Sequence, residues 1–259
     1  MKKVFLAILA TIAVVGMVSC NKDDNGKGGK KGGKTAAEVN IKIDGDFADW
    51  AALTDVASAE NDADAAYPNL LSMKVAGDKS NIYVYFEYEI PEAAVQGTAA
   101  PMVIHLNSDN DCTTGGAYWM WAGNENEPVE VDGESKIIPG IDYFIATDEG
   151  FLSSDLSAIN EEPEDLALYK FVGTTGVDVW SDNAMEKQQL TSFLEMKGKV
   201  TEGIAIVELS ILRSAVGCTR TGNIRIGLVV QNNVDWGANG VIPGGASAGA
   251  KEMLEVALP

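Results

Sequence analysis

Residues 81–90 most strongly limit what this chain can fold into. Ile82, Val84, Phe86 and Tyr88 alternate with more polar neighbours, and a period of two is typical of a β-strand with one buried face. Similar segments, bounded by Gly, Asn, Asp or Pro, predict strands at residues 39–43, 71–76, 102–106, 118–122, 141–147, 166–172, 191–196, 204–209, 224–230 and 252–258. Helical signals are limited to single turns at residues 47–53 and 211–216. We therefore expect an all-β fold, an antiparallel β-sandwich of jelly-roll or immunoglobulin-like type.

The N-terminus predicts a secretory signal peptide over residues 1–19. Two lysines precede an apolar run from residue 4 to residue 18, shorter than the roughly 20 residues of a membrane span. The run ends in Gly-Met-Val-Ser-Cys at residues 16–20, which resembles the lipobox of bacterial lipoproteins. The resemblance implies that Cys20 is diacylated, with palmitate or a similar fatty acid, and becomes the first residue of the mature chain. An ordinary signal peptide and an uncleaved anchor helix are the alternatives.

Residues 20–34 predict a lipidated cysteine followed by a tether. Asn-Lys-Asp-Asp at residues 21–24 resembles the export signal of Bacteroidota lipoproteins, which implies an outer-membrane lipoprotein exposed at the cell surface. The periplasmic face of the outer membrane is the alternative. Residues 25–34 contain only Asn, Gly and Lys, so they cannot form a core and act as a flexible linker. No repeat or second linker interrupts residues 35–259, which we expect to form a single domain.

The charge of the chain excludes some functions. Residues 1–34 hold seven of the 19 basic and two of the 38 acidic residues, so the predicted domain keeps 12 and 36, a formal charge of −24. Nucleic-acid binding needs clustered Lys and Arg, and is not expected here. The single histidine, His105, excludes most zinc sites and most Ser-His-Asp triads. His105 is out of phase with the apolar Ile104 and Leu106. We expect it to face the other side of its sheet as a structural histidine with satisfied ring nitrogens.

Five short motifs suggest a family. They are Ile43-Asp44-Gly45-Asp46-Phe47-Ala48-Asp49-Trp50, residues 75–84, residues 104–111 with Gly115-Gly116, residues 140–143 and residues 203–209. Their order resembles the family 9 carbohydrate-binding modules and related bacterial lipoproteins. The resemblance implies a β-sandwich that binds sugars, often at the ends of glycan chains, and often carries calcium. It favours a non-catalytic, lipid-anchored, cell-surface glycan-binding protein with outer-membrane transporters or hydrolases as partners.

The tryptophans are the candidate sugar platforms, because sugar rings present apolar C–H faces that stack on indole. Trp236 and Trp180 sit among short polar side chains near the ends of predicted strands, as binding-loop residues do. Trp121 is a third candidate and should share a strand face with Trp119. Buried packing is the alternative role for each. The predicted polar partners are Asn232, Asn233 and Asp235 for Trp236, and Asp178, Asp182 and Asn183 for Trp180.

Two further sites are expected from residue type. Asn107, Asp109 and Asp111 place oxygen atoms at alternate positions of one loop, a pattern that suits the oxygen-rich shell of calcium. An Asn- and Asp-rich turn without metal is the alternative. Cys112 and Cys218 are left after Cys20 is lipidated, and an oxidising compartment would allow them to form a disulfide.

Other functions stay open. A glycoside hydrolase would use paired carboxylates, and a structural or adhesion module would bind no small ligand. A haem-binding relative of the same sandwich would need a His and Met axial pair, for which His105 is the one histidine.

Overall fold

The computed structural model describes residues 39–61, 64–92, 101–147, 152, 156, 166–190, 192–232, 236–245 and 249–259. The predicted signal peptide, Cys20 and the tether lie outside these residues. Residues 35–259 form one compact unit. None of the helices in the described part of the chain is long and apolar enough to span a membrane.

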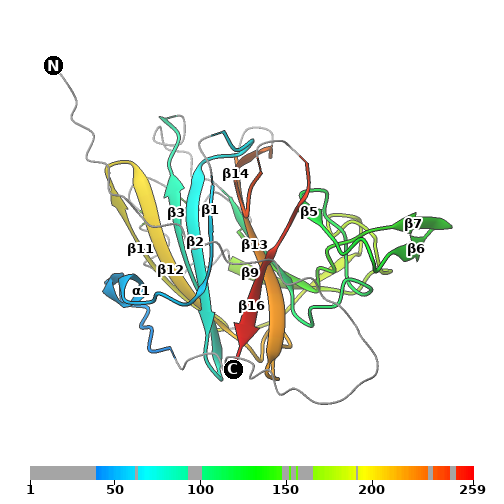
Figure 1. Cartoon of the computed structure of the whole chain (residues 1–259), viewed down its shortest axis with the longest axis horizontal. Coiled ribbons are helices and arrows are strands. Elements are labelled where there is room, and N and C mark those ends of the chain that lie inside the picture. Colours follow the sequence, from blue (N-terminus) through cyan, green and yellow to red (C-terminus); the bar gives the residue numbers. More distant parts are fainter. Residues whose placement is uncertain are drawn as a thin grey trace, which may run out of the picture. The chain divides into compact units, whose positions relative to one another are not determined.

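Two antiparallel sheets form the domain, and Figure 1 shows them as two layers. In order across the first sheet lie β1 (Ala57–Glu60), β2 (Leu70–Gly77), β3 (Asn81–Glu89), β12 (Ile204–Leu212) and β11 (Leu194–Thr201). The second sheet has the order β10 (Met185–Lys187), β9 (Leu166–Phe171), β8 (Tyr143–Thr147), β4 (Met102–Asn107), β13 (Gly222–Gln231) and β14 (Ala238–Ile242), and β16 (Leu254–Leu258) also pairs with β13. The all-β, antiparallel sandwich expected from the sequence is confirmed.

The smaller elements lie outside this sandwich. They are α1 (Ala48–Ala51), the parallel pair β5 (Trp121–Ala122) and β15 (Lys251–Glu252), and the hairpin of β6 (Val129–Val131) and β7 (Glu134–Lys136). Figure 1 shows α1 beside the first sheet and the β6–β7 hairpin projecting from the opposite side of the domain.

The main core lies between the two sheets. Alternate residues of β3 pack there, including Val84 and Phe86, and meet Ile104 and Leu106 of β4. This burial is the physical reason for the period of two, since successive side chains of a strand point to opposite faces.

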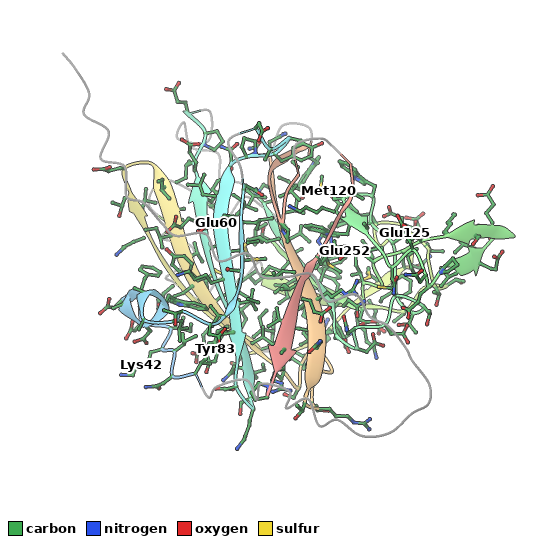
Figure 2. The ribbon with its side chains drawn as sticks, in the orientation of Figure 1. Lys42, Glu60, Tyr83, Met120, Glu125 and Glu252 are labelled. Carbon is green, nitrogen blue, oxygen red and sulfur yellow. The ribbon has the colours of Figure 1, made fainter. Side chains whose placement is uncertain are left out.

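The outer face of the first sheet is also covered. Tyr83 and Tyr85 of β3 are buried against Ile41 and Trp50, and Figure 2 shows Tyr83 on the α1 side of the domain. The expectation that β3 has one exposed face is therefore wrong. Residues 39–43, expected as a strand, instead form an irregular segment of this cover.

The outer face of the second sheet carries its own apolar cluster, so all six residues of β4 are buried. Residues 118–122 were expected as a strand, but residues 118–120 contain a turn and only Trp121 and Ala122 are extended. The helical turn expected at residues 211–216 is also absent, because β12 continues to Leu212 before the chain turns.

Candidate functional site

A cleft of about 730 Å³ opens on the outer face of the second sheet. Small-molecule sites typically measure roughly 300–1,000 Å³. Strands β4, β8 and β9 contribute Val103, Phe144, Ala146, Thr147 and Tyr169. The other lining residues are Tyr118, Trp119, Asp178, Val179, Trp180, Ser181, Met185, Gln231 and Trp236, most of them on connections between strands. Rigid strands thus present a surface that is bordered by side chains from separate loops.

Three of the five tryptophans are exposed, and all three line this cleft. The exposed fractions are 54% for Trp119, 49% for Trp180 and 58% for Trp236. Trp50 and Trp121 are buried. Exposed aromatic rings gathered in one concave surface are typical of binding sites rather than of ordinary solvent-facing surface. Trp180 and Trp236, the first two platform candidates from the sequence, are thus both exposed in this cleft, and their contact with sugar stays a prediction.

The prediction that Trp121 is a sugar platform is wrong, because its ring is buried and does not line the cleft. The indole packs closely against β13 at Gly227, where any β-carbon would lie 2.5 Å from Trp121 Cζ2. The turn before Trp121, closed by a 3.0 Å hydrogen bond from its backbone N–H to the carbonyl of Tyr118, breaks the period of two. Trp119 therefore points to solvent while Trp121 points to the sheet. The sequence did carry one signal, because Tyr-Trp-Met-Trp at residues 118–121 shows no alternation between polar and apolar side chains.

Trp180 is held in place from two directions. Its ring stacks on Phe144 of β8, with ring centroids 4.8 Å apart and an interplanar angle of 29°. Its backbone N–H donates a 2.8 Å hydrogen bond to Asp178 Oδ1. Of its predicted polar partners, Asp178 lines the cleft, whereas Asp182 and Asn183 do not.

Trp236 lies in the connection between β13 and β14. Its φ of 63° lies in the left-handed region, which non-glycine residues adopt uncommonly and often at functional sites. The connection is closed by a 2.7 Å hydrogen bond from Asn232 N–H to the Gly237 carbonyl, and Gln231 Nε2 donates to the Trp236 carbonyl at 3.2 Å. Gln231 is the polar neighbour that lines the cleft, whereas the predicted partner Asn232 closes the loop through its backbone N–H. The predicted partners Asn233 and Asp235 lie outside the described residues.

The cleft is poor in charge. Among the described residues that line it, Asp178 is the one carboxylate, and no Lys or Arg contributes. Thr147, Ser181 and Gln231 add neutral hydrogen-bonding groups. Burial, with a smaller contribution from Asp178, raises the pKa of Tyr118 to about 12, so its hydroxyl stays protonated at neutral pH.

His105 lies beneath the cleft, on the outward face of β4 as expected. It is completely buried, and neither ring nitrogen has a hydrogen-bond partner in the described part of the chain. The expectation of satisfied nitrogens is therefore wrong, because the ring is enclosed by Tyr118, Trp121 and Phe144 rather than by polar groups. This burial lowers the pKa of His105 to about 3, so the ring is neutral at physiological pH.

The loop predicted to bind calcium forms a hydrogen-bonded turn. Asp109 Oδ1 accepts the Asp111 N–H at 2.9 Å, and Asp111 Oδ1 accepts the Thr113 N–H at 2.8 Å. Asn107 is buried and its Nδ2 donates to the Pro139 carbonyl at 2.8 Å. No cluster of three or more His, Cys, Asp or Glu side chains suited to a metal ion occurs in the described residues. Calcium binding by Asn107, Asp109 and Asp111 stays a prediction.

Cys112 and Cys218 are both buried free thiols, so the structure does not contain the disulfide considered from the sequence. Each sulfur has separate neighbours. Cys112 Sγ lies 3.4 Å from Arg225 Nη1, and Cys218 Sγ lies 3.5 Å from the carbonyl oxygen of Ser108. Burial raises the pKa of the Cys218 thiol to about 12, which keeps it in the unreactive protonated form.

Several solved structures match the chain, and two of them, both family 9 carbohydrate-binding modules, are distant likenesses. A family 9 carbohydrate-binding module from Caldicellulosiruptor kristjanssonii in complex with glucose has a TM-score of 0.35 and 11% sequence identity, over 85% of this chain and 92% of that one. The same kind of module in complex with cellotriose has a TM-score of 0.34 and 10% identity, over 86% and 90% of the two chains. No protein-family model matches the chain, and no curated protein matches it significantly. Likenesses this distant do not define a function, which must be inferred from the cleft itself.

Proposed function

We propose that this protein is a non-catalytic glycan-binding protein and that the tryptophan cleft is its binding site. The observation that carries the proposal is that Trp119, Trp180 and Trp236 are all exposed and all line one cleft. Indole faces match the apolar C–H faces of sugar rings. Ser181, Gln231 and Asp178 lie in the same cleft, where they would supply hydrogen bonds to hydroxyl groups.

The charge distribution favours neutral saccharides over acidic ones. The predicted domain has a formal charge of −24, and the described lining of the cleft holds Asp178 but no Lys or Arg. A uronate or sulfate group brought into this cleft would meet repulsion without a compensating cation. A neutral oligosaccharide would meet no such repulsion.

We further propose that the cleft acts at the cell surface. Residues 16–24 carry the lipobox-like and export-signal-like sequences, so the domain would hang from the outer membrane on a lipid at Cys20 and the glycine-rich tether. Outer-membrane transporters or hydrolases would then be the machinery that uses the captured glycan. No direct insertion of the domain into the membrane is part of this proposal.

A binding role accounts for the cleft better than glycoside hydrolysis. A typical glycosidase places two carboxyl groups on either side of the scissile bond. In the described lining Asp178 is the one carboxylate, and its Oδ1 accepts the backbone N–H of Trp180. This arrangement gives Asp178 a role in shaping the loop.

Binding and hydrolysis are tested together. Full-length protein is assayed against an array of neutral and acidic glycans, and hits are measured by titration calorimetry and by release of reducing ends. We expect dissociation constants of about 10 μM to 1 mM for neutral oligosaccharides, as for a shallow site, and no hydrolysis.

Single substitutions test whether the tryptophans of the cleft form the binding site. Trp236→Ala and Trp180→Ala should each abolish measurable binding. Leu212→Ala and Ile137→Ala are matched controls, because both residues are exposed apolar side chains that do not line the cleft. Retained binding in both tryptophan variants, or hydrolysis by the wild type, would overturn the proposal.

A further inference from the structure

We infer that His105 is a positioning residue, whose buried ring holds Trp119 and Trp180 at the cleft through the rings of Tyr118 and Phe144. The inference rests on the proposed function in one respect, namely that these tryptophans contact the glycan. The positioning itself is a property of the unliganded protein and can be measured without sugar.

The first step is the contact between His105 and Tyr118. The two rings are stacked, with centroids 4.8 Å apart and an interplanar angle of 22°. Tyr118 in turn packs edge to face with Trp119 and Trp180, with ring centroids 6.0 Å and 6.5 Å apart and interplanar angles of 62° and 66°. Tyr118 thus lies between the buried histidine and two of the exposed rings.

A second path leads from His105 to Trp180. The imidazole meets Phe144 edge to face at 6.1 Å and 63°, and Phe144 stacks directly under Trp180. His105 therefore contacts both rings that Trp180 rests against. Loss of the imidazole would leave Tyr118 and Phe144 free to tilt into the same space, and both contacts of Trp180 would change together.

The surroundings of His105 indicate that its role depends on the flat shape of its ring and not on its polar atoms. Both ring nitrogens are buried without a hydrogen-bond partner in the described residues. Burying polar atoms without partners costs folding free energy, so hydrogen bonding does not explain a histidine at this position. A flat ring that stacks on Tyr118 and meets Phe144 and Trp121 edge to face is what the site requires, and a phenyl ring meets that requirement without the two unsatisfied nitrogens. A branched aliphatic side chain of similar size does not offer a flat face to Tyr118.

Trp236 provides an internal control. It lies on a different connection, and the described structure shows no ring contact between it and His105, Tyr118 or Phe144. Trp50 is a second control, because it is buried on the outer face of the other sheet. A specific positioning role predicts changes at Trp119 and Trp180 and none at these two.

The experiment is fluorine NMR of the full-length protein, purified in detergent and labelled with 5-fluorotryptophan. Single Trp→Phe variants assign the five resonances. We expect His105→Leu to shift or broaden the resonances of Trp119 and Trp180, and also of Trp121, which touches His105 directly. The resonances of Trp50 and Trp236 should be unchanged. His105→Phe should restore the wild-type positions of Trp119 and Trp180, with a melting temperature at least equal to that of the wild type.

Three results would overturn the inference: unchanged Trp119 and Trp180 resonances in His105→Leu, equal changes in all five, or failure of His105→Phe to restore them. If His105→Leu does not fold, the His105→Phe spectrum alone decides, since an intact pattern supports the role of the flat ring and an altered one contradicts it. Calorimetry with a glycan bound by the wild type adds an expected loss of about threefold to tenfold in affinity for His105→Leu. Absence of any glycan binding by the wild type would instead contradict the proposed function and leave the fluorine result in force.

Discussion

The indole Nε1 of Trp50 donates a 3.1 Å hydrogen bond to Oε2 of Glu208, which lies 158 residues later in the chain. The other carboxylate oxygen, Oε1, accepts the backbone N–H groups of Asp44 at 3.0 Å and Gly45 at 2.7 Å. Glu208 is fully buried, and this burial raises the pKa of its carboxyl group above the ordinary value despite the three donors. One carboxylate on β12 therefore fastens the segment that covers the outer face of the first sheet.

Glu208→Gln should destabilise the domain. The amide oxygen can still accept the two backbone N–H groups, but the amide nitrogen would then face the indole N–H of Trp50, donor against donor. We expect a loss of about 1–3 kcal/mol in the free energy of unfolding, the usual cost of leaving a buried polar group unsatisfied. Urea denaturation measures it.

The matched control is the same substitution in a Trp50→Phe background, which has no indole N–H to leave unpaired. There Glu208→Gln should cost less than in the wild type. An equal cost in both backgrounds would show that the Trp50 hydrogen bond does not determine the effect.

Truncation of Trp121 should destabilise the domain, whereas truncation of Trp236 should leave its stability almost unchanged. Trp121→Ala removes a ring buried against Gly227 and should cost about 3–5 kcal/mol of stability. Trp236→Ala removes a ring that is 58% exposed and should change stability by less than about 0.5 kcal/mol. Thermal unfolding of the two variants decides this, and a large loss in Trp236→Ala would remove it from the list of exposed platforms.

His105 should make stability depend on pH. Its pKa is lowered to about 3 in the folded protein, while an unfolded histidine titrates near 6.5. As the pH falls, the unfolded chain therefore binds the proton before the folded protein does. The contribution of His105 to the free energy of unfolding is complete above pH 6.5 and is lost as the pH falls towards 3. At pH 5 the loss is about 2 kcal/mol relative to pH 8.

The measurement compares urea denaturation of the wild type and His105→Phe from pH 8 to pH 5. Because carboxylates titrate in both proteins, the difference between the two curves isolates the histidine. Parallel curves would mean that the folded pKa is close to that of the unfolded chain.

Calcium, if bound, should stabilise the fold by mass action. A ligand at 100 times its dissociation constant adds about 2.7 kcal/mol, so a chelator should lower the melting temperature. Asp109→Asn with Asp111→Asn is the appropriate variant, because asparagine keeps the oxygen that accepts each N–H of the turn while removing the charge. The chelator effect should vanish in this variant. Identical melting of the wild type with and without chelator would exclude the metal.

Lipidation of Cys20 should decide where the protein is found. Cys20→Ala should move the protein from the membrane fraction into the soluble fraction, because the acyl chains are the proposed anchor. Asp23→Ala with Asp24→Ala should keep the lipid but reduce protease accessibility on intact cells. A Cys20→Ala protein that stays in the membrane fraction with its signal sequence uncleaved would point to an anchor helix instead.

The local pattern of the sequence predicted the strands well where one face packs in the central core. Ile82, Val84 and Phe86 repeat every second residue because alternate positions point between the sheets. The same pattern could not reveal that Tyr83 and Tyr85 are buried too, since their cover comes from the distant segment around Trp50.

The candidate site was only partly predictable for the same reason. Short polar neighbours identified Trp180 and Trp236 as loop residues, and both line the cleft. Trp119 and Trp121 were misassigned because period two applies only within a strand, and a turn precedes Trp121. The cleft itself joins residues from β4 to the β13–β14 connection, and such long-range proximity has no local sequence signal.

The contact between Gly227 and Trp121 has a consequence for how relatives of this protein can diverge. A β-carbon at residue 227 would lie 2.5 Å from the indole, so residue 227 cannot gain a side chain while the indole of Trp121 keeps its position. A lineage that gains a side chain at residue 227 must first lose the indole at residue 121, or pass through a poorly packed intermediate. The two positions should therefore covary across homologues, whereas the exposed ring of Trp119, two residues away, is free to change as ligands change.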